Sequence, residues 1–146
     1  MIKLTEQQIE EIASDLDCGL RCYYNKRTGE IKTILDFDSW MGADEELWEE
    51  DQKEVDENRE DYLEFEGMSS HEAFKLMADF AESIDNSKLR EKLVNALNRS
   101  KPFRNFKWQI DNSGEFRQVW FDFKKKRYIE WVKDQLEQYN LVDDNE

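Results

Sequence analysis

The hydrophobic residues near the start of the chain recur at helical spacing. Those on one side of the expected helix are Ile9, Ile12, Ala13 and Leu16. Glutamates occupy the other side, a pattern typical of a helix that lies on a core. Thr5 and Gln8 form a capping box, in which each side chain satisfies a backbone donor of the first turn. We therefore predict a first helix that ends near residues 17–19.

From residue 20 the apolar period changes to two, which is typical of a strand. Leu20, Cys22 and Tyr24 are predicted to face inward, with Tyr23 among the residues that face outward. The turn NKRTGE and a second alternating run at residues 31–35 complete a hairpin. Because a two-stranded hairpin is marginal alone, we predict that YLEF at residues 62–65 adds a third strand.

The segment between the hairpin and YLEF is acidic. Leu47, Trp48 and Val55 are spaced to form a thin apolar seam on one helix, and the rest of that helix carries carboxylates. Blocks of like charge are more often surface-exposed or flexible than functional, so we expect a charged, partly mobile excursion. The alternative is a docking surface for a basic partner.

The second half of the chain predicts a series of helices. Ser69 and Glu72 form a second capping box, and Ser100 and Pro102 are expected to open a later helix, with Ser100 as its cap. The apolar stripe predicted after Ser69 consists of Phe74, Met77, Phe80, Ala81 and Ile84. A short helix over residues 89–97 follows, and from residue 115 a long one has wide apolar coverage.

These elements predict an α+β fold that is mainly α-helical, with a small N-terminal antiparallel sheet packed on helices. The length of 146 residues is that of about one domain, so we predict a single domain over residues 1–146. Within it, residues 1–66 hold the first helix, the hairpin and the acidic segment, residues 67–142 form the helical part, and residues 143–146 are an acidic tail.

The stretch KPFRNFKWQI at residues 101–110 alternates positive charge with aromatic rings. On a helix, Phe103, Phe106 and Ile110 fall on one face, while Arg104 and Lys107 lie together on another. Trp108 points away from the apolar stripe, so it either packs against a neighbouring element or stands exposed.

Charge is distributed unevenly along the chain, whose net charge is −14. Residues 44–66 hold thirteen acidic and two basic residues, and residues 99–128 hold nine basic and three acidic ones. The basic stretch is therefore a candidate nucleic-acid surface, with cations for phosphates and one ring for stacking. The candidate contacts are Arg99, Lys101, Arg104, Lys107, Trp108, Lys124, Lys125, Lys126 and Arg127.

The sequence offers few residues in an arrangement typical of a catalytic site. The single histidine, His71, falls in the first turn of a helix, and Cys18 and Cys22 lack the spacing of a zinc half-site or a redox motif. We expect no cofactor and no metal. No segment has the apolar length of a membrane helix, and the first residues lack the apolar centre of a secretory signal, so we expect a cytoplasmic protein.

By elimination, a non-catalytic protein-interaction or regulatory module is the favoured function, with a protein partner. Trp40 and Trp48 stand beside charged residues, as interface anchors often do, and are candidate contacts with that partner. Nucleic-acid binding through residues 99–127 is the first alternative, and an unrecognised enzyme is the second.

The second half of the chain resembles a known family. The order FKLMADF, LREKLVNAL, FRNFKWQI, WFDF and YIEWVKDQL, over about residues 62–141, is similar to the uncharacterised protein family numbered 0158, a set of small bacterial proteins. The resemblance implies a bacterial, cytoplasmic, mixed helical protein. It implies no activity, and no functional residue follows from it.

Overall fold

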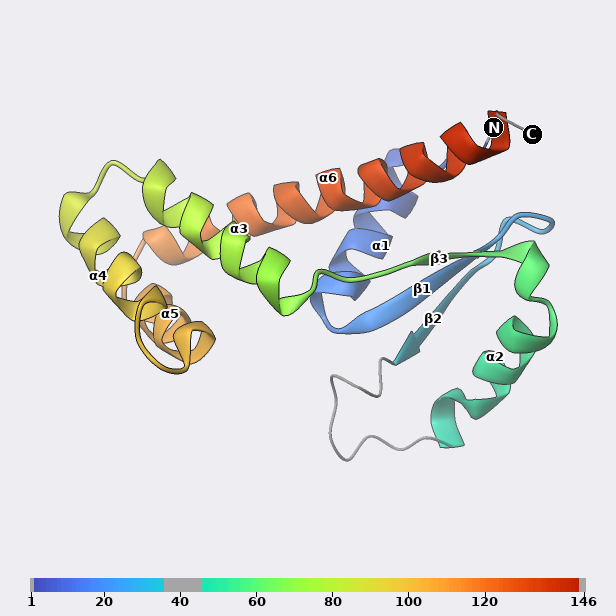
Figure 1. Cartoon of the computed structure of the whole chain (residues 1–146), viewed down its shortest axis with the longest axis horizontal. Helices are drawn as coiled ribbons and strands as arrows, with labels where there is room; N and C mark the ends of the chain where they lie inside the picture. The colour runs from blue at the N-terminus through green and yellow to red at the C-terminus, as the bar shows by residue number, and fades with distance from the viewer. Residues whose placement is uncertain (1, 36–45, 145–146) are drawn as a thin grey trace. The chain divides into compact units, whose positions relative to one another are not determined.

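The computed structural model describes residues 2–35 and 46–144, which hold six α-helices and three strands. In chain order these are α1 (Glu6–Asp17), β1 (Leu20–Asn25), β2 (Ile31–Leu35), α2 (Glu46–Glu57), the short 3₁₀ helix η1 (Arg59–Asp61), β3 (Tyr62–Phe65), α3 (Ser70–Ser83), α4 (Ser87–Leu97), α5 (Pro102–Asp111) and α6 (Phe116–Asp144) (Figure 1). The expectation of a mainly helical α+β fold is confirmed. None of the described helices is both long enough and apolar enough to cross a membrane.

The chain divides into two compact units. The sheet unit comprises Met1–Gly67 and Tyr128–Glu146, and the helical unit comprises Met68–Arg127. Helix α6 begins in the helical unit and ends in the sheet unit. That the two units together form a single domain over residues 1–146 stays a prediction.

The sheet unit is built on three antiparallel strands in the order β2-β1-β3. In the central strand, Cys22 lies between Thr33 and Phe65. The turn between β1 and β2 is closed by the Asn25 side chain, which accepts hydrogen bonds from two backbone N–H groups, and by Gly29 at a φ of 79°. The predicted hairpin and the predicted third strand are both present.

Both faces of this sheet are covered, which corrects the prediction that Tyr23 faces outward. Helix α1 packs against β1 on one face, where the Asp15 carboxylate accepts hydrogen bonds from the Cys22 thiol and the Thr33 hydroxyl. On the other face, Val55 of α2 joins Tyr23 in a buried cluster. Tyr23 is only 4% exposed because α2 covers the face that strand periodicity alone assigns to solvent.

The C-terminal half of α6 is attached to β3 by side chains that bond to backbone. Trp131 Nε1 donates to the Glu66 carbonyl at 2.7 Å, and Gln135 both accepts from the Glu66 N–H and donates to its carbonyl. The Tyr139 hydroxyl donates to the Glu64 carbonyl. These bonds satisfy backbone groups at the end of β3 that would otherwise need water.

The helical unit has an aromatic core. Phe80 of α3, Phe106 of α5 and Trp120 of α6 meet edge to face, with ring centroids 4.9–6.4 Å apart. Such pairs stabilise a core beyond the area they bury. Ser69 accepts a hydrogen bond from the Glu72 N–H, and Asn86 caps α4 in the same way. The core fixes α5 by one face and leaves its other face outward.

Candidate functional site

The N-cap of helix α5 lies one residue later than predicted. The N-cap is Lys101, in a left-handed conformation with φ 56° and ψ 55°, and no side chain caps the first turn. The Ser100 carbonyl accepts a hydrogen bond from Asn105 Nδ2 at 2.9 Å. The prediction that Ser100 is the cap was wrong because the chain turns sharply at Lys101, which places Ser100 outside the helix. Pro102 is the first helical residue, as predicted, since its missing N–H needs no partner there.

The two faces of α5 differ as the sequence pattern predicted, with one exception. Phe106 and Ile110 are buried, and Arg104 and Lys107 are exposed. The open question about Trp108 is answered, because its side chain is 63% exposed. Phe103 was expected in the apolar stripe but is 39% exposed, because it lies in the first turn, at the edge of the contact with the core.

An open hollow of about 590 Å³ lies along the outward face of α5. Its lining, which we call the α5 surface, consists of Ser100, Lys101, Arg104, Asn105, Lys107, Trp108 and Asp111. The cations of this surface and its indole ring are thus brought together, while the one carboxylate, Asp111, pairs with Arg117 at 3.3 Å. The arrangement can bind anionic groups and one flat or apolar group at the same place.

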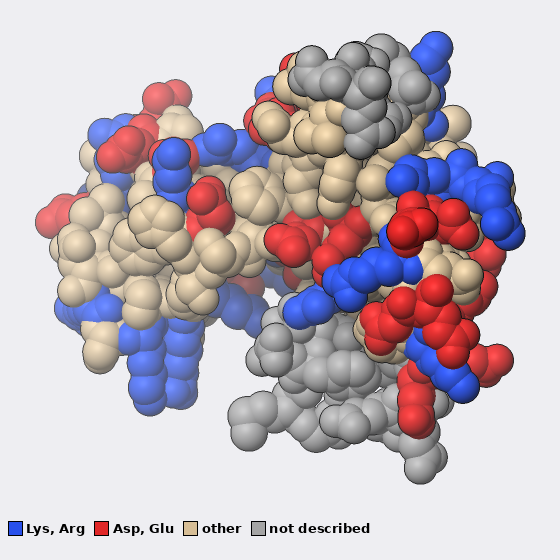
Figure 2. All heavy atoms as spheres, turned by 45° about the vertical axis from the view of Figure 1, so that its right-hand side comes forward, with Lys and Arg blue, Asp and Glu red and all other residues tan. Residues whose placement is uncertain are grey.

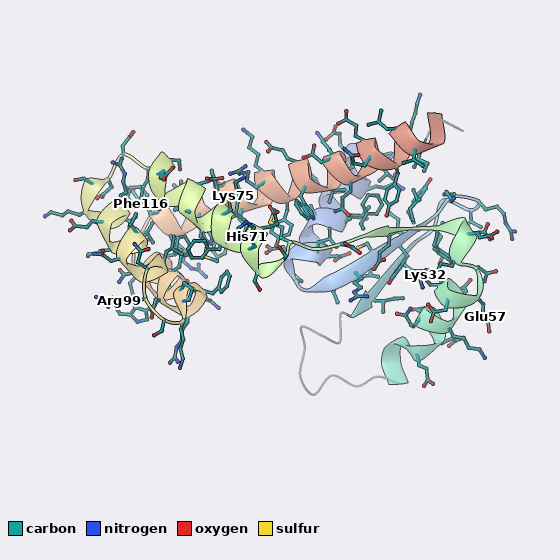
Figure 3. All side chains as sticks on the ribbon, viewed as in Figure 1. Lys32, Glu57, His71, Lys75, Arg99 and Phe116 are labelled. Atoms are coloured by element: carbon teal, nitrogen blue, oxygen red, sulfur yellow. The ribbon has the colours of Figure 1, made fainter. Side chains whose placement is uncertain are left out.

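The other predicted nucleic-acid contacts do not line this hollow. Arg127 forms an ion pair with Asp79 and lies over the Phe123 ring, and Lys124 lies over the rings of Trp120 and Phe121. Two of the four basic residues at positions 124–127 therefore pack along neighbouring side chains. Lys125 and Lys126 are exposed on α6, and Arg99 is exposed beyond the end of α4 (Figure 3).

The two compact units carry opposite net charge. The helical unit has thirteen Lys and Arg against eight Asp and Glu, a net of +5, and the sheet unit has eight against 27, a net of −19. In Figure 2, Lys and Arg side chains extend together from the lower edge of the helical unit at the left. The basic α5 surface therefore belongs to a unit that is itself basic.

The acidic helix α2 is held to the sheet by a lysine. Lys32 Nζ lies 2.6 Å from a Glu54 carboxylate oxygen and 3.2 Å from an Asp51 oxygen. The hydrogen bond to Glu54 is the largest cause that raises the pKa of Lys32 above its ordinary value, and the bond to Asp51 adds to it. Lys32 lies beside α2 and Glu57 on the outward side of that helix (Figure 3). Within the acidic segment, residues 46–57 form α2, which Val55 and Lys32 hold against the sheet. That the segment is partly mobile stays a prediction.

The side chains of the two predicted interface tryptophans lie outside the part of the chain that the structure describes. Trp40 lies outside the described residues, and although Trp48 is in α2, its side chain also lies outside what the structure describes. The lining residues that sequence reasoning missed are Ser100, Asn105 and Asp111. Asp111 had a usable signal, since it follows Arg104 by seven positions and Trp108 by three on one helix face.

Neither His71 nor the two cysteines are among the residues that line the hollow. His71 is exposed in the first turn of α3, as the sequence predicted (Figure 3). Burial raises the pKa of the Cys22 thiol to about 12, so Cys22 is not a thiolate near neutral pH. Among the described residues, no three or more His, Cys, Asp or Glu side chains are grouped to hold a metal ion.

Comparison with known proteins gives a family and one named relative. A protein of Pseudomonas aeruginosa, "UPF0158 protein PA5073", is 28% identical over 134 residues, which cover 91% of this chain and 82% of that protein. No solved structure matches the chain significantly. The model of a family described as "Uncharacterised protein family (UPF0158)" matches residues 1–144. The chain therefore belongs to the uncharacterised protein family UPF0158.

Proposed function

We propose that the protein is a non-catalytic interaction module of the bacterial cytoplasm that binds an acidic protein through the α5 surface. The observation that carries this proposal is Trp108, which is 63% exposed in one hollow with Lys101, Arg104 and Lys107. Exposing a large indole to water is unfavourable. Tryptophan and arginine are also the residue types most enriched among those that dominate binding at protein interfaces.

The charge of the hollow favours an acidic partner. Its three cations face a single carboxylate, Asp111, and Arg117 already pairs with that group. The helical unit as a whole, these residues included, carries a net charge of +5. Complementary charge speeds encounter and sets orientation, while a buried aromatic anchor contributes more of the affinity.

The location and protonation of the reactive side chains support the non-catalytic part of the proposal. The hollow holds neither His71 nor a cysteine, and the buried Cys22 thiol is held protonated. A nucleophile or a general base needs a partner that activates it within hydrogen-bond reach. The hollow offers cations, amide and hydroxyl groups, a ring and one carboxylate, Asp111, which pairs with Arg117, and these are groups for binding.

The proposal is tested by a pull-down from extract of the cells the protein comes from, with and without nuclease. The baits are the wild type, Trp108→Ala, a triple variant Lys101→Glu, Arg104→Glu, Lys107→Glu, and a control triple variant Lys75→Glu, Lys88→Glu, Lys92→Glu. The control makes the same charge change at exposed lysines of the same unit that do not line the hollow.

We expect the wild type and the control variant to retain one protein partner after nuclease treatment. Trp108→Ala and the α5 triple variant should lose it, although circular dichroism shows them folded. Retention of the partner by the α5 triple variant would contradict the proposal. So would an enzymatic activity that depends on residues of the hollow.

Single-stranded nucleic acid is the second candidate ligand, and the exposed ring of Trp108 among cations favours it. Bases stack on exposed aromatic rings while lysine and arginine contact phosphates. The net charge of −14 opposes any anionic partner at long range, and it opposes a polyphosphate most because each nucleotide carries a charge, which is why we place this candidate second. Nuclease-sensitive recovery, with affinity for a labelled oligonucleotide that falls steeply as salt rises, would favour it over a protein partner.

A further inference from the structure

We propose that the acidic partner of the α5 surface is helix α2 of a second copy of this chain. This inference rests on the proposed function and names its partner. The part of α2 concerned, which we call the α2 face, consists of Glu49, Glu50, Lys53, Asp56 and Glu57.

The α2 face is exposed and its orientation is fixed by the sheet unit. Val55 is buried on the opposite side of the helix, and Asp51 and Glu54 are engaged by Lys32 of β2. All five residues of the α2 face are exposed. Anchoring from one side therefore leaves four carboxylates and one lysine on the solvent side.

The two surfaces are complementary in charge. The α5 surface carries three cations and one carboxylate, and the α2 face carries four carboxylates and one cation. The minority charge of each surface is already paired within its own chain, Asp111 with Arg117 and Lys53 with Glu57, and Asp56 pairs with Arg59. Each surface therefore carries a net excess of charge, positive on the α5 surface and negative on the α2 face, and this opposite excess favours their contact over a contact between two like surfaces.

The two surfaces also agree in size. Helix α2 has 12 residues and α5 has 10, so at 1.5 Å per residue they are about 18 and 15 Å long. Trp108 can pack across the methylene groups of the glutamate and lysine side chains on α2, because such side chains expose apolar stems beneath their charged ends. Burial of that ring supplies the apolar contact that exposed ion pairs lack.

Each copy carries both surfaces, so a contact between the α5 surface of one copy and the α2 face of another leaves one α2 face and one α5 surface unoccupied. Such a head-to-tail contact extends into a ring or an open chain. A pair of short helices buries less than the roughly 800 Å² per partner of a standard interface. The association is therefore expected to be weak, dependent on concentration, and sensitive to salt.

The experiment is sedimentation equilibrium over a concentration series at about 50 mM and about 500 mM salt, where the Debye length falls from about 14 Å to about 4 Å. We expect the wild-type mass at low salt to rise with concentration to at least twice the monomer mass of 17.7 kDa, and to return to 17.7 kDa at high salt. A wild type that stays at 17.7 kDa throughout would overturn the inference.

Charge reversal tests which surfaces are in contact. The α5 triple variant above and the α2 triple variant Glu49→Lys, Glu50→Lys, Glu57→Lys should each be monomeric, because both surfaces of one copy then carry the same sign. An equal mixture of the two variants should recover a mass of at least twice 17.7 kDa, because each basic surface meets an acidic one. Failure of the mixture to associate, when both variants are folded, would overturn the α2–α5 pairing.

Matched controls separate this pairing from general charge effects. The variant Lys75→Glu, Lys88→Glu, Lys92→Glu and the variant Glu10→Lys, Glu130→Lys, Glu137→Lys change the same charges at exposed positions elsewhere in each unit. Both should associate as the wild type does. Equal loss of association in the controls would overturn the inference.

Failure of this inference and failure of the proposed function give different results. A monomeric wild type that still captures another protein through Trp108 overturns self-association and leaves the interaction module standing. A monomeric wild type that captures neither a protein nor a nucleic acid overturns both. A monomeric wild type that binds an oligonucleotide overturns self-association and favours the nucleic-acid candidate.

Discussion

Lys32 of strand β2 lies 2.6 Å from Glu54 of helix α2, so a lysine that is only 13% exposed ties the most acidic helix of the chain to the sheet. Asp51 contributes a second carboxylate to the same ammonium group. The pairing lets a helix with many carboxylates lie against a small sheet, because two of its charges are neutralised at the contact. It also determines which carboxylates remain outward for a partner.

Replacing Lys32 with methionine should destabilise the sheet unit by about 1–2 kcal/mol, because two carboxylates lose their partner beside a largely buried side chain. The carboxylates are themselves 42% and 48% exposed, so water offsets part of the loss. Urea unfolding monitored by circular dichroism measures the change. Lys53→Met is the matched control on α2: its pair with Glu57 spans 4.0 Å between exposed groups, and we expect less than about 0.5 kcal/mol. Equal losses in the two variants would contradict the role assigned to Lys32.

Replacing Phe106 with alanine should destabilise the helical unit by about 3–5 kcal/mol, because the ring is 2% exposed and packs on Phe80 and Trp120. Phe103→Ala on the same helix removes a ring that is 39% exposed, and we expect a loss below about 1 kcal/mol. Thermal unfolding of both variants measures the difference. A larger loss for Phe103 would show that the packed face of α5 is assigned incorrectly.

Replacing Lys101 with glycine should stabilise the helical unit by about 0.5–1 kcal/mol. Lys101 has a φ of 56°, a conformation that costs a residue with a Cβ atom more than it costs glycine. Lys107→Gly removes the same charge from the interior of α5 and should destabilise the unit by about 1 kcal/mol. Opposite signs in denaturant unfolding are the expected outcome, and a destabilised Lys101→Gly variant would contradict the left-handed cap.

Alkaline pH should destabilise the sheet unit through Cys22. Burial is the largest cause that raises the pKa of this thiol from an ordinary 9.0 to about 12, with the nearby Asp15 carboxylate adding to it. A raised pKa in the folded state gives a stabilisation that is complete below pH 9 and is lost as the pH rises from 9 to 12, because only the unfolded chain then releases the proton.

Unfolding free energies of the wild type and Cys22→Val from pH 7 to pH 11 test this expectation. The wild type should lose stability more steeply above pH 9 than the variant, which has no thiol to ionise. Three tyrosines whose pKa values are raised by burial remain in both proteins and contribute to the slope that the variant keeps: Tyr128, whose pKa is raised to about 12, Tyr23 and Tyr139. Parallel curves for the two proteins would contradict a buried, protonated thiol.

Much of the local structure follows from the order of the residues. The capping box of Thr5 and Gln8 and the separation of Phe106 from Lys107 both depend on groups within a few positions of one another. Period, caps and turn residues act over one or two turns of chain, so the sequence alone predicts them. The position of the basic residues that line the hollow was predictable for the same reason, since helical spacing places them on one face.

The remaining features depend on segments far apart in the chain. Tyr23 is buried because α2 covers it, and Arg127 is engaged because Asp79, 48 positions earlier, lies beside it. Spacing within α5 could not decide whether Trp108 was covered by a neighbour or exposed. The local sequence pattern determined which elements form and which residues share a face. Burial and pairing of side chains were decided only by the tertiary structure, because they depend on which distant segment of the chain contacts each face.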